Sequence, residues 1–282
     1  MSKIIDGKSI RDKELKLYKN RVDELKANGL LPCLAVILVG NDPASRVYVN
    51  NKKKACENVG IKSLEFALPE ETSESEVINL VKTLNRDIGV HGILCQLPLP
   101  GHIDKEKVIN TISPMKDVDC FHPENVGKLF LGKSHFVPCT PMGIMTMLKY
   151  EGIDVSGKHC VIIGRSDIVG KPMALLMLQS NATVTVCHSK TSNLSSYTKQ
   201  ADILVSAVGK AKFVKKDMVK SGAVVIDVGM NKDETGKLCG DIDFDEVKDI
   251  CSVITPVPGG VGPMTITMLI KNTITAAQAQ IN

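Results

Sequence analysis

Short apolar segments alternate with longer amphipathic segments along most of this chain. Residues 33–39 (CLAVILV) and 160–163 (CVII) are continuous apolar runs, which are typical of strands buried on both faces. Residues 74–85 instead carry apolar side chains at helical spacing, which predicts a helix with one buried face. Such alternation of strands and helices predicts an α/β fold in which helices cover parallel sheets.

The alternation is interrupted once, at residues 112–140, where the sequence is polar and loop-like. A chain of 282 residues is long enough for two domains, and we therefore predict two lobes on either side of this interruption. We expect helices at 9–28, 43–58, 74–85, about 141–152, 170–179 and 261–279, and strands at 33–39, 63–68, 92–95, 160–163, 183–187, 202–205, 223–228 and 252–254.

Composition excludes several classes of function. The net charge is only +4, and no basic stripe is interleaved with aromatic residues, so we expect no nucleic-acid partner. The nine cysteines form no C-x-x-C pair and the six histidines show no ligand spacing, which predicts reduced thiols in a cytoplasm and no metal site. Residues 1–16 are too polar for a signal peptide, and no apolar run has membrane-spanning length, so we expect no membrane partner.

Residues 160–172 (CVIIGRSDIVGKP) have the pattern of a strand, a turn bounded by glycines and a helix. Such a turn lets the backbone approach a diphosphate, and the helix N-terminus offers free N–H groups. The spacing is neither G-x-G-x-x-G nor that of a P-loop, since five residues separate Gly164 from Gly170 and Pro172 replaces a hydroxyl residue. Position therefore favours a dinucleotide site, with a plain β–α turn as the alternative.

The next predicted strand bears on which dinucleotide would bind. It ends at His188-Ser189-Lys190-Thr191, without the carboxylate that binds the ribose 2′-hydroxyl in NAD enzymes. Arg165, Ser189 and Lys190 favour NADP, although Lys190 alone is equally well explained as an exposed loop lysine. The loops at 206–210 and 227–231 also follow apolar runs, so they should lie at the same edge of the sheet.

In the first lobe, Tyr48 and Lys52 are four residues apart in a predicted helix. Asp42 and Pro43 are typical of a helix start, and Gly60 is typical of a helix end. Four-residue spacing places the tyrosine and the lysine on one helical face, where they could hold and protonate a planar, nitrogen-rich substrate. Without further evidence, a solvated surface lysine and a boundary tyrosine are the preferred explanation of the pair.

Taken together, these segments resemble the bifunctional methylenetetrahydrofolate dehydrogenase/methenyltetrahydrofolate cyclohydrolase family. QLPLP at 96–100 and TPVPGGVGPM at 255–264 are together close to diagnostic. The other matching segments are YVNNKKKAC (48–56), GILC (92–95), KDVD with FHP (116–123), PCTP (138–141), GRSDIVG (164–170), HSKT (188–191) and IDVGMN (226–231).

The resemblance implies an α/β fold of two lobes. Residues 1–137, completed by the C-terminal helix 265–282, would form a catalytic, folate-binding lobe with a parallel sheet, and residues 138–264 would form a Rossmann-type NADP-binding lobe. The implied enzyme of one-carbon metabolism oxidises 5,10-methylenetetrahydrofolate with NADP to the 5,10-methenyl form. It then hydrolyses that product to 10-formyltetrahydrofolate. Members of the family are typically homodimers that act on tetrahydrofolate derivatives.

The resemblance also assigns roles to individual residues. Lys52 would be the catalytic lysine, Tyr48 would stack on the folate, Gln96 would orient Lys52, and Asp119 would hydrogen-bond the pterin. These four form the expected catalytic set, and the last three also bind substrate. The expected NADP contacts are Gly164, Arg165, Ser166, Ser189 and Met230, and the residues expected to shape the substrate site are Pro258, Gly259 and Gly260.

Two residues depart from the family pattern. Asp167 stands where asparagine or lysine is more usual, which adds a negative charge near the expected phosphate turn, and Cys120 stands where glycine is usual.

Three alternative functions stay open. A monofunctional family member should lack one activity, a shikimate-type or amino-acid dehydrogenase should lack QLPLP and TPVPGGVGPM, and a nucleotide-sensing protein without turnover should have lost Lys52 or Gln96.

Overall fold

The computed structural model describes residues 2–280. Within that range the chain forms two compact α/β units. Unit 1 comprises residues 2–12 and 140–265, and unit 2 comprises residues 13–139 and 266–280. Each unit contains a parallel sheet, so the predicted two-domain α/β fold is confirmed.

The first strand explains why the N-terminal residues pack with unit 1. Strand β1 (Lys3–Ile4) runs parallel to β11 (Val253–Ile254), and Ile5 N donates to Ile254 O at 2.9 Å. The sequence-based division had assigned these residues to the first lobe. A two-residue strand has no detectable period, so the sequence gives no signal for this pairing.

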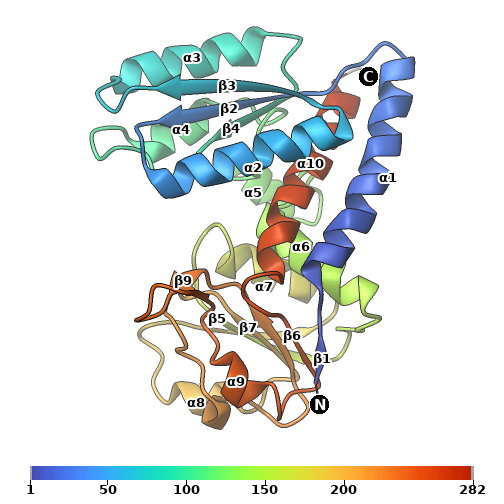
Figure 1. The fold of residues 1–282 in the computed structure, drawn as a ribbon, viewed down its shortest axis with the longest axis vertical. Helices are drawn as coiled ribbons and strands as arrows, with labels where there is room; N and C mark the ends of the chain where they lie inside the picture. Colours follow the sequence, from blue (N-terminus) through green and yellow to red (C-terminus); the bar gives the residue numbers. More distant parts are fainter. Residues whose placement is uncertain (1, 281–282) are drawn as a thin grey trace. The chain divides into compact units, whose positions relative to one another are not determined.

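The sheet of unit 2 has the order β3-β2-β4, with β2 (Cys33–Val39) in the centre. Every residue of β2 is buried, as its continuous apolar sequence predicts, and β3 (Lys62–Leu68) and β4 (Gly92–Cys95) lie parallel on either side. Helices α2 (Pro43–Val59) and α3 (Glu74–Arg86) lie on opposite faces of this sheet (Figure 1).

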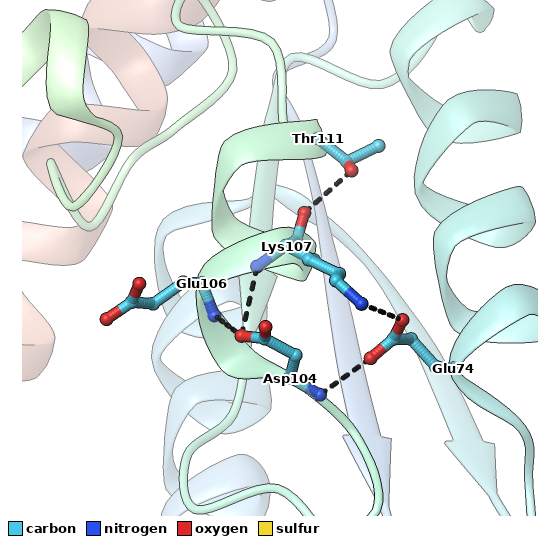
Figure 2. Close-up of polar contacts among 5 residues, drawn as sticks. All are labelled: Glu74, Asp104, Glu106, Lys107 and Thr111. Atoms are coloured by element: carbon cyan, nitrogen blue, oxygen red, sulfur yellow. Dashed lines mark hydrogen bonds and ion pairs between the residues drawn. The ribbon is translucent and has the colours of Figure 1, made fainter.

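One face of the sheet is covered by α3 and the shorter α4 (Lys105–Thr111), which was not predicted. Figure 2 shows how the two helices are joined at their N-termini. Glu74 accepts from the backbone N of Asp104 at 2.8 Å and from Lys107 Nζ at 2.9 Å, and these two contacts lower the pKa of its carboxyl. Asp104 in turn caps α4 by accepting from Glu106 N at 2.9 Å.

Helix α2 begins and ends where its capping residues predict. Asp42 Oδ2 accepts from Ser45 N at 2.8 Å, Pro43 is the first helical residue, and Gly60 adopts a left-handed conformation with φ +82° at the C-terminus. Tyr48 and Lys52 therefore lie one helical turn apart, as predicted.

Residues 112–140, which the sequence suggested to be a loop, contain the helix α5 (Pro123–Phe130). His122 caps this helix by accepting from Glu124 N at 3.1 Å, and Pro123 occupies its first turn. An eight-residue helix is too short to give a clear helical period, which is why it was missed. The three long helices α1 (Gly7–Ala27), α6 (Cys139–Tyr150) and α10 (Val261–Ala279) agree with the predicted helices.

The sheet of unit 1 has six parallel strands in the order β1-β11-β8-β7-β5-β6. After α6 the chain enters the sheet at β5, adds the edge strand β6 on one side of β5 and then returns to add β7 and β8 on the other side. Such a reversal creates a switch point at the carboxyl ends of β5 and β7, where doubly wound sheets bind their ligands. The bounds are β5 (His159–Ile163), β6 (Thr183–Cys187), β7 (Ile203–Ser206) and β8 (Val224–Asp227).

Short elements complete unit 1 around an apolar core that the strands share with Val214, Val219 and Val247. Among residues 2–280, no helix has both the length and the apolar character needed to cross a membrane. The remaining elements are α7 (Gly170–Gln179), α8 (Leu194–Thr198), η1 (Lys216–Met218), β9 (Asn231–Lys232), β10 (Leu238–Cys239) and α9 (Phe244–Val247).

Candidate active site

Lys52 and Gln96 are in direct contact in unit 2. Lys52 Nζ donates to Gln96 Oε1 at 2.9 Å, and Gln96 Nε2 donates to the carbonyl of Leu97 at 2.7 Å. Gln96 follows β4 directly, and its backbone N bonds to Ile37 O at 2.8 Å, so it extends the sheet hydrogen bonding by one residue. The amide therefore has a fixed orientation and presents an uncharged oxygen to the amine.

Asp119 lies in the same electrostatic environment. Its carboxyl is half-buried and accepts from Cys139 Sγ at 3.7 Å. Desolvation raises the pKa of Asp119, the Lys52 ammonium opposes this increase, and the nearby Asp117 adds to it. The structure thus brings together the Lys52 amine, the Gln96 amide and the Asp119 carboxyl group. The first and the last of these lie 67 positions apart in the sequence (119 − 52).

Hydrogen bonds to the Asp117 side chain fix the loop that carries Asp119. The Asp117 carboxylate is buried and accepts from His122 N at 2.9 Å, Phe121 N at 3.2 Å and Asn125 Nδ2 at 2.8 Å. Three donors of this kind define the path of the backbone on both sides of Asp119.

Cys120, which we noted above as a departure from the expected pattern, has a left-handed backbone with φ +60°. Glycine adopts this conformation without steric cost, so the cysteine is strained there. Its side chain is buried and donates to Phe136 O at 3.2 Å, and burial raises the pKa of the thiol to about 12. The thiol is therefore a packing group that compensates for an unfavourable backbone conformation.

Asn272, on the C-terminal helix α10, was not singled out from the sequence. Its side-chain Nδ2 donates to Val118 O at 2.8 Å and to Val137 O at 2.9 Å, and it lies 3.8 Å from Cys139 Sγ. It thereby joins the residue before Asp119 to the chain that precedes α6. The only signal in the sequence is an asparagine in a largely apolar helix, where a buried amide needs partners.

Tyr48 lies one turn before Lys52 on α2 and is 36% exposed. Partial burial raises the pKa of its phenol, so the hydroxyl stays protonated at neutral pH. Its ring is therefore available as a flat, neutral surface, and its stacking on a folate stays a prediction.

In unit 1, Gly164 and Gly170 make a turn in which backbone packs directly on backbone. Gly164 has φ +125°, and a Cβ there would lie 2.4 Å from Ala207 O at the end of β7. A Cβ at Gly170 would lie 2.2 Å from Gly164 O. Ser166 Oγ accepts from Val169 N at 3.2 Å at the start of α7. This turn at a switch point fits the close approach of a dinucleotide diphosphate.

The other predicted cofactor contacts follow strands of the same sheet. Arg165 and Ser166 follow β5, Ser189 follows β6 and Met230 follows β8, and all four side chains are exposed. They therefore share the carboxyl edge of one sheet, and their contact with a cofactor stays a prediction.

Asp167, which we noted above as a departure from the expected pattern, lies in the turn before α7 and forms an ion pair with Lys171 in the first turn of that helix. Both side chains are mostly exposed, so the pair is weak, but it balances the additional charge near the turn. We therefore expect Asp167 to have little effect on anion binding at this turn.

Pro258, Gly259 and Gly260 form the turn before α10 in unit 1. Gly259 has φ +108°, and a Cβ at Gly260 would lie 2.6 Å from Pro256 O. A Cβ at Gly7 would lie 1.9 Å from Gly260 O, so this turn also packs against the start of α1. The close packing explains the glycines, and a role in substrate binding stays a prediction.

Comparison with known proteins agrees with both units. Residues 5–119 match the catalytic domain of tetrahydrofolate dehydrogenase/cyclohydrolase, and residues 138–281 match the NAD(P)-binding domain of the same family. The bifunctional protein FolD of Acetivibrio thermocellus is 58% identical over 99% of this chain and 98% of its own. The bifunctional protein FolD of Lachnoclostridium phytofermentans is 60% identical over 99% of both chains.

Solved structures agree as well. The bifunctional FolD methylenetetrahydrofolate dehydrogenase/cyclohydrolase of Campylobacter jejuni is 52% identical, with a TM-score of 0.97 over 99% of both chains. A methylenetetrahydrofolate dehydrogenase-cyclohydrolase of Trypanosoma brucei, solved with NADP and an inhibitor, is 38% identical, with a TM-score of 0.95 over 100% of this chain and 99% of its own. This chain therefore belongs to the bifunctional tetrahydrofolate dehydrogenase/cyclohydrolase family.

Proposed function

We propose that this protein oxidises 5,10-methylenetetrahydrofolate with NADP and then hydrolyses the 5,10-methenyl product to 10-formyltetrahydrofolate. The observation that carries the proposal is the 2.9 Å hydrogen bond between Lys52 and Gln96 near Asp119, within the unit that matches the family's catalytic domain. The family membership supplies the reaction, and these side chains supply groups suited to it.

Substrate binding needs a flat surface and a hydrogen-bonding partner for the pterin. Tyr48 supplies a partly exposed ring on the same helix as Lys52. Asp119 supplies a carboxyl group that the hydrogen bonds of Asp117 and Asn272 to its loop hold in position. Orientation of this kind is the main contribution a protein makes to hydride transfer.

When bound, NADP would accept the hydride from the one-carbon bridge of the substrate. Gly164, Ser166 and the N-terminus of α7 would hold its diphosphate, because a tight glycine turn that leads into a helix N-terminus presents backbone N–H groups to an anion. Hydride loss leaves the substrate as the methenyl cation.

Hydrolysis of the methenyl cation requires water to add and a proton to move to the departing nitrogen as the ring opens. Lys52 is the group we assign to these proton transfers. The Gln96 oxygen that accepts from this amine is uncharged, so it contacts the amine without forming an ion pair. Gln96 thus orients the amine and leaves it free to exchange protons.

A preference for NADP over NAD rests on charge. Arg165 is exposed in the turn after β5, Ser189 and Lys190 are exposed after β6, and β5 and β6 are neighbours in the sheet. A guanidinium group and hydroxyl at this edge suit a ribose 2′-phosphate, and no carboxylate follows β6 to bind a 2′-hydroxyl. The relative from Trypanosoma brucei was solved with NADP, which supports the same choice.

We also infer a homodimer. Strand β6 is an edge strand of the unit 1 sheet, and Val186 on it is 38% exposed, while Leu178 at the end of α7 is 60% exposed. An apolar edge strand is a surface that a second chain can cover. Light scattering should give twice the monomer mass, and Val186→Lys should shift the protein toward the monomer.

The cysteines suit a reducing compartment, and we infer a cytoplasmic location. All nine are free thiols, and eight of them are buried. Unpaired thiols in such number are typical of proteins kept reduced by the cytoplasm.

The deciding experiment is an absorbance assay with methylenetetrahydrofolate and NADP that follows reduced cofactor and the methenyl intermediate separately. The proposal expects reduced cofactor to form while the methenyl intermediate is consumed. Formation of reduced cofactor with lasting methenyl accumulation would identify a dehydrogenase alone. Hydrolysis of added methenyltetrahydrofolate without cofactor reduction would identify a cyclohydrolase alone.

A further inference from the structure

Two buried carboxylates lie at the carboxyl edge of the unit 1 sheet and take no part in the chemistry proposed above. Asp227 is the last residue of β8 and is 3% exposed, and Asp241 follows β10 and is fully buried. Burying a carboxylate costs free energy unless its oxygens accept hydrogen bonds. The donors that contact these two carboxylates therefore show which segments of the chain they fix in place.

Asp241 accepts four hydrogen bonds, two on each oxygen. Oδ2 accepts from Val208 N at 2.7 Å and Ser206 Oγ at 3.2 Å, and Oδ1 accepts from Lys210 N and Asn231 Nδ2, both at 2.9 Å. Three of the donors belong to the end of β7 and the loop after it, and the fourth, Asn231, is the first residue of β9, where the loop after β8 ends. One carboxylate thus joins two neighbouring loops at the sheet edge.

Asp227 holds Asp241 in turn. Its Oδ1 accepts from the backbone N of Asp241 and of Gly229, both at 2.9 Å, and its Oδ2 accepts from Ile242 N at 3.0 Å. The glycines make room for this arrangement. A Cβ at Gly229 would lie 2.2 Å from Asp241 Oδ1, and a Cβ at Gly240 would lie 1.8 Å from Asp227 Oδ2.

The loop that Asp241 holds is also part of the turn assigned to the dinucleotide. Ala207, between Ser206 and Val208, has the carbonyl oxygen that a Cβ at Gly164 would meet at 2.4 Å. A shift of this loop would therefore move the Ala207 carbonyl that packs against Gly164 in the glycine turn. The loop after β8 carries Met230, an expected cofactor contact, beside Asn231.

We propose that Asp241 is the positioning residue of the dinucleotide site, and that it sets cofactor affinity by fixing the loops after β7 and β8 against the glycine turn. The proposal rests on the proposed function, in that NADP binds at this edge of unit 1. Asp241 itself is fully buried, so it acts on the cofactor only through the two loops.

The substitution Asp241→Asn tests this role with a minimal change of shape. Each Asp241 oxygen accepts from one backbone N–H, that of Val208 or that of Lys210, so an amide NH2 in place of either oxygen directs a donor at a backbone donor. No orientation of the asparagine satisfies all four partners. The loops should relax, and the dissociation constant for NADP should rise roughly tenfold, as expected when buried donors lose their acceptor.

Three measurements separate positioning from a general loss of structure. Titration calorimetry gives the NADP dissociation constant on protein that circular dichroism shows to be folded. Steady-state kinetics should show a higher KM for NADP with a smaller change in dehydrogenase kcat at saturating cofactor. Hydrolysis of methenyltetrahydrofolate, which consumes no cofactor and depends on Lys52 in unit 2, should stay within twofold of the parent.

Asp202→Asn is the matched control, because Asp202 directly precedes β7 and so lies at the amino ends of the strands of the same sheet.

The outcomes are distinct. A folded Asp241→Asn protein that binds NADP within twofold of the parent overturns the proposal, and so does an equal weakening in Asp202→Asn. If Asp241→Asn does not fold, Asn231→Ala removes a single donor and should weaken NADP binding about threefold, whereas unchanged binding overturns the proposal. A parent protein that binds no NADP overturns the proposed function itself, which is a different result from a weakening confined to the variants.

Discussion

Lys52 Nζ lies 2.9 Å from Gln96 Oε1, so the amine on α2 contacts a neutral acceptor that directly follows β4. A helix and a strand end thus position the two groups, and neither depends on a long flexible loop. Gln96 is held at its backbone by Ile37 and at its amide by Leu97. The surrounding structure of unit 2 therefore fixes this contact, and Lys52 and Gln96 can each be substituted separately.

Removing the amine should abolish hydrolysis and spare cofactor binding. In Lys52→Met the side chain keeps its length but cannot exchange protons, so cyclohydrolase activity should fall at least a hundredfold. NADP binding, measured by calorimetry, should stay within twofold. Lys53→Met is the matched control, since Lys53 is exposed on the same helix and should leave both properties unchanged. Retained hydrolysis of methenyltetrahydrofolate in Lys52→Met would contradict the assignment.

Introducing a charge beside the amine should also slow hydrolysis. Gln96→Glu replaces the neutral acceptor with a carboxylate of similar size, which would keep the amine protonated. We expect cyclohydrolase activity to fall about tenfold or more at neutral pH, and to recover in part as the pH rises. A pH–rate profile of methenyl hydrolysis checks this. A profile superimposable on that of the parent would show that the contact has no role in proton transfer.

Local signals explain why much of unit 2 could be predicted from the sequence. Asp42, Pro43 and Gly60 each act on the backbone within a few residues, so they fix the ends of α2 without tertiary contacts. The continuous apolar run of β2 likewise reports burial on both faces. Four-residue spacing then places Tyr48 and Lys52 on one face.

Contacts between distant residues could not be predicted in this way. Asn272 bonds to Val118, which lies 154 positions away, and Asp241 bonds to Ser206, which lies 35 positions away. Hydrogen-bonding capacity is visible in the sequence, but the identity of the partner depends on the folded topology. The short helices α4 and α5 were missed for a related reason, because their caps and packing stabilise them more than their periodicity does.

Removing the Asn272 amide should loosen the Asp119 loop. Asn272→Ala removes the amide donor from the carbonyls of Val118 and Val137, which should destabilise the protein by about 1–3 kcal/mol. The KM for methylenetetrahydrofolate should rise severalfold, while the KM for NADP stays near the parent value. Urea denaturation and steady-state kinetics measure the two effects. Lys271→Ala, at an exposed neighbour on α10, should change neither, and an equal effect there would refute the argument.

Arg165 should govern the choice of cofactor. Arg165→Ala removes the exposed guanidinium from the turn after β5, so kcat/KM with NADP should fall about tenfold or more while kcat/KM with NAD changes little. The ratio of the two values is the measurement. Lys158→Ala removes a cation before β5, at the opposite end of that strand, and should leave the ratio unchanged. Equal use of both cofactors by the parent would contradict the charge argument.

Asp227 should make the stability of unit 1 depend on pH. Burial raises its pKa to about 7, and the charge of Asp241 adds to the increase, although three backbone N–H groups oppose it. In the unfolded chain an aspartate has a pKa near 3.9. The folded protein therefore holds a proton that the unfolded chain has released between about pH 4 and pH 7. The stabilisation from this proton is fully present below about pH 4 and is lost as the pH rises through 7.

The expected result is a free energy of unfolding that falls with rising pH in this window, with Asp227 contributing up to about 1.4 kcal/mol per pH unit. Urea denaturation followed by circular dichroism at pH 5, 6 and 7 measures the slope. Asp227→Asn should be less stable than the parent because it loses a carboxylate oxygen that accepts from backbone N–H groups, yet its stability should depend less steeply on pH. Asp245→Asn is the control, because Lys248 lowers the pKa of the exposed Asp245, which is ionised throughout this range in both states. Parallel slopes for the parent and Asp227→Asn would show that Asp227 does not take up a proton near neutrality.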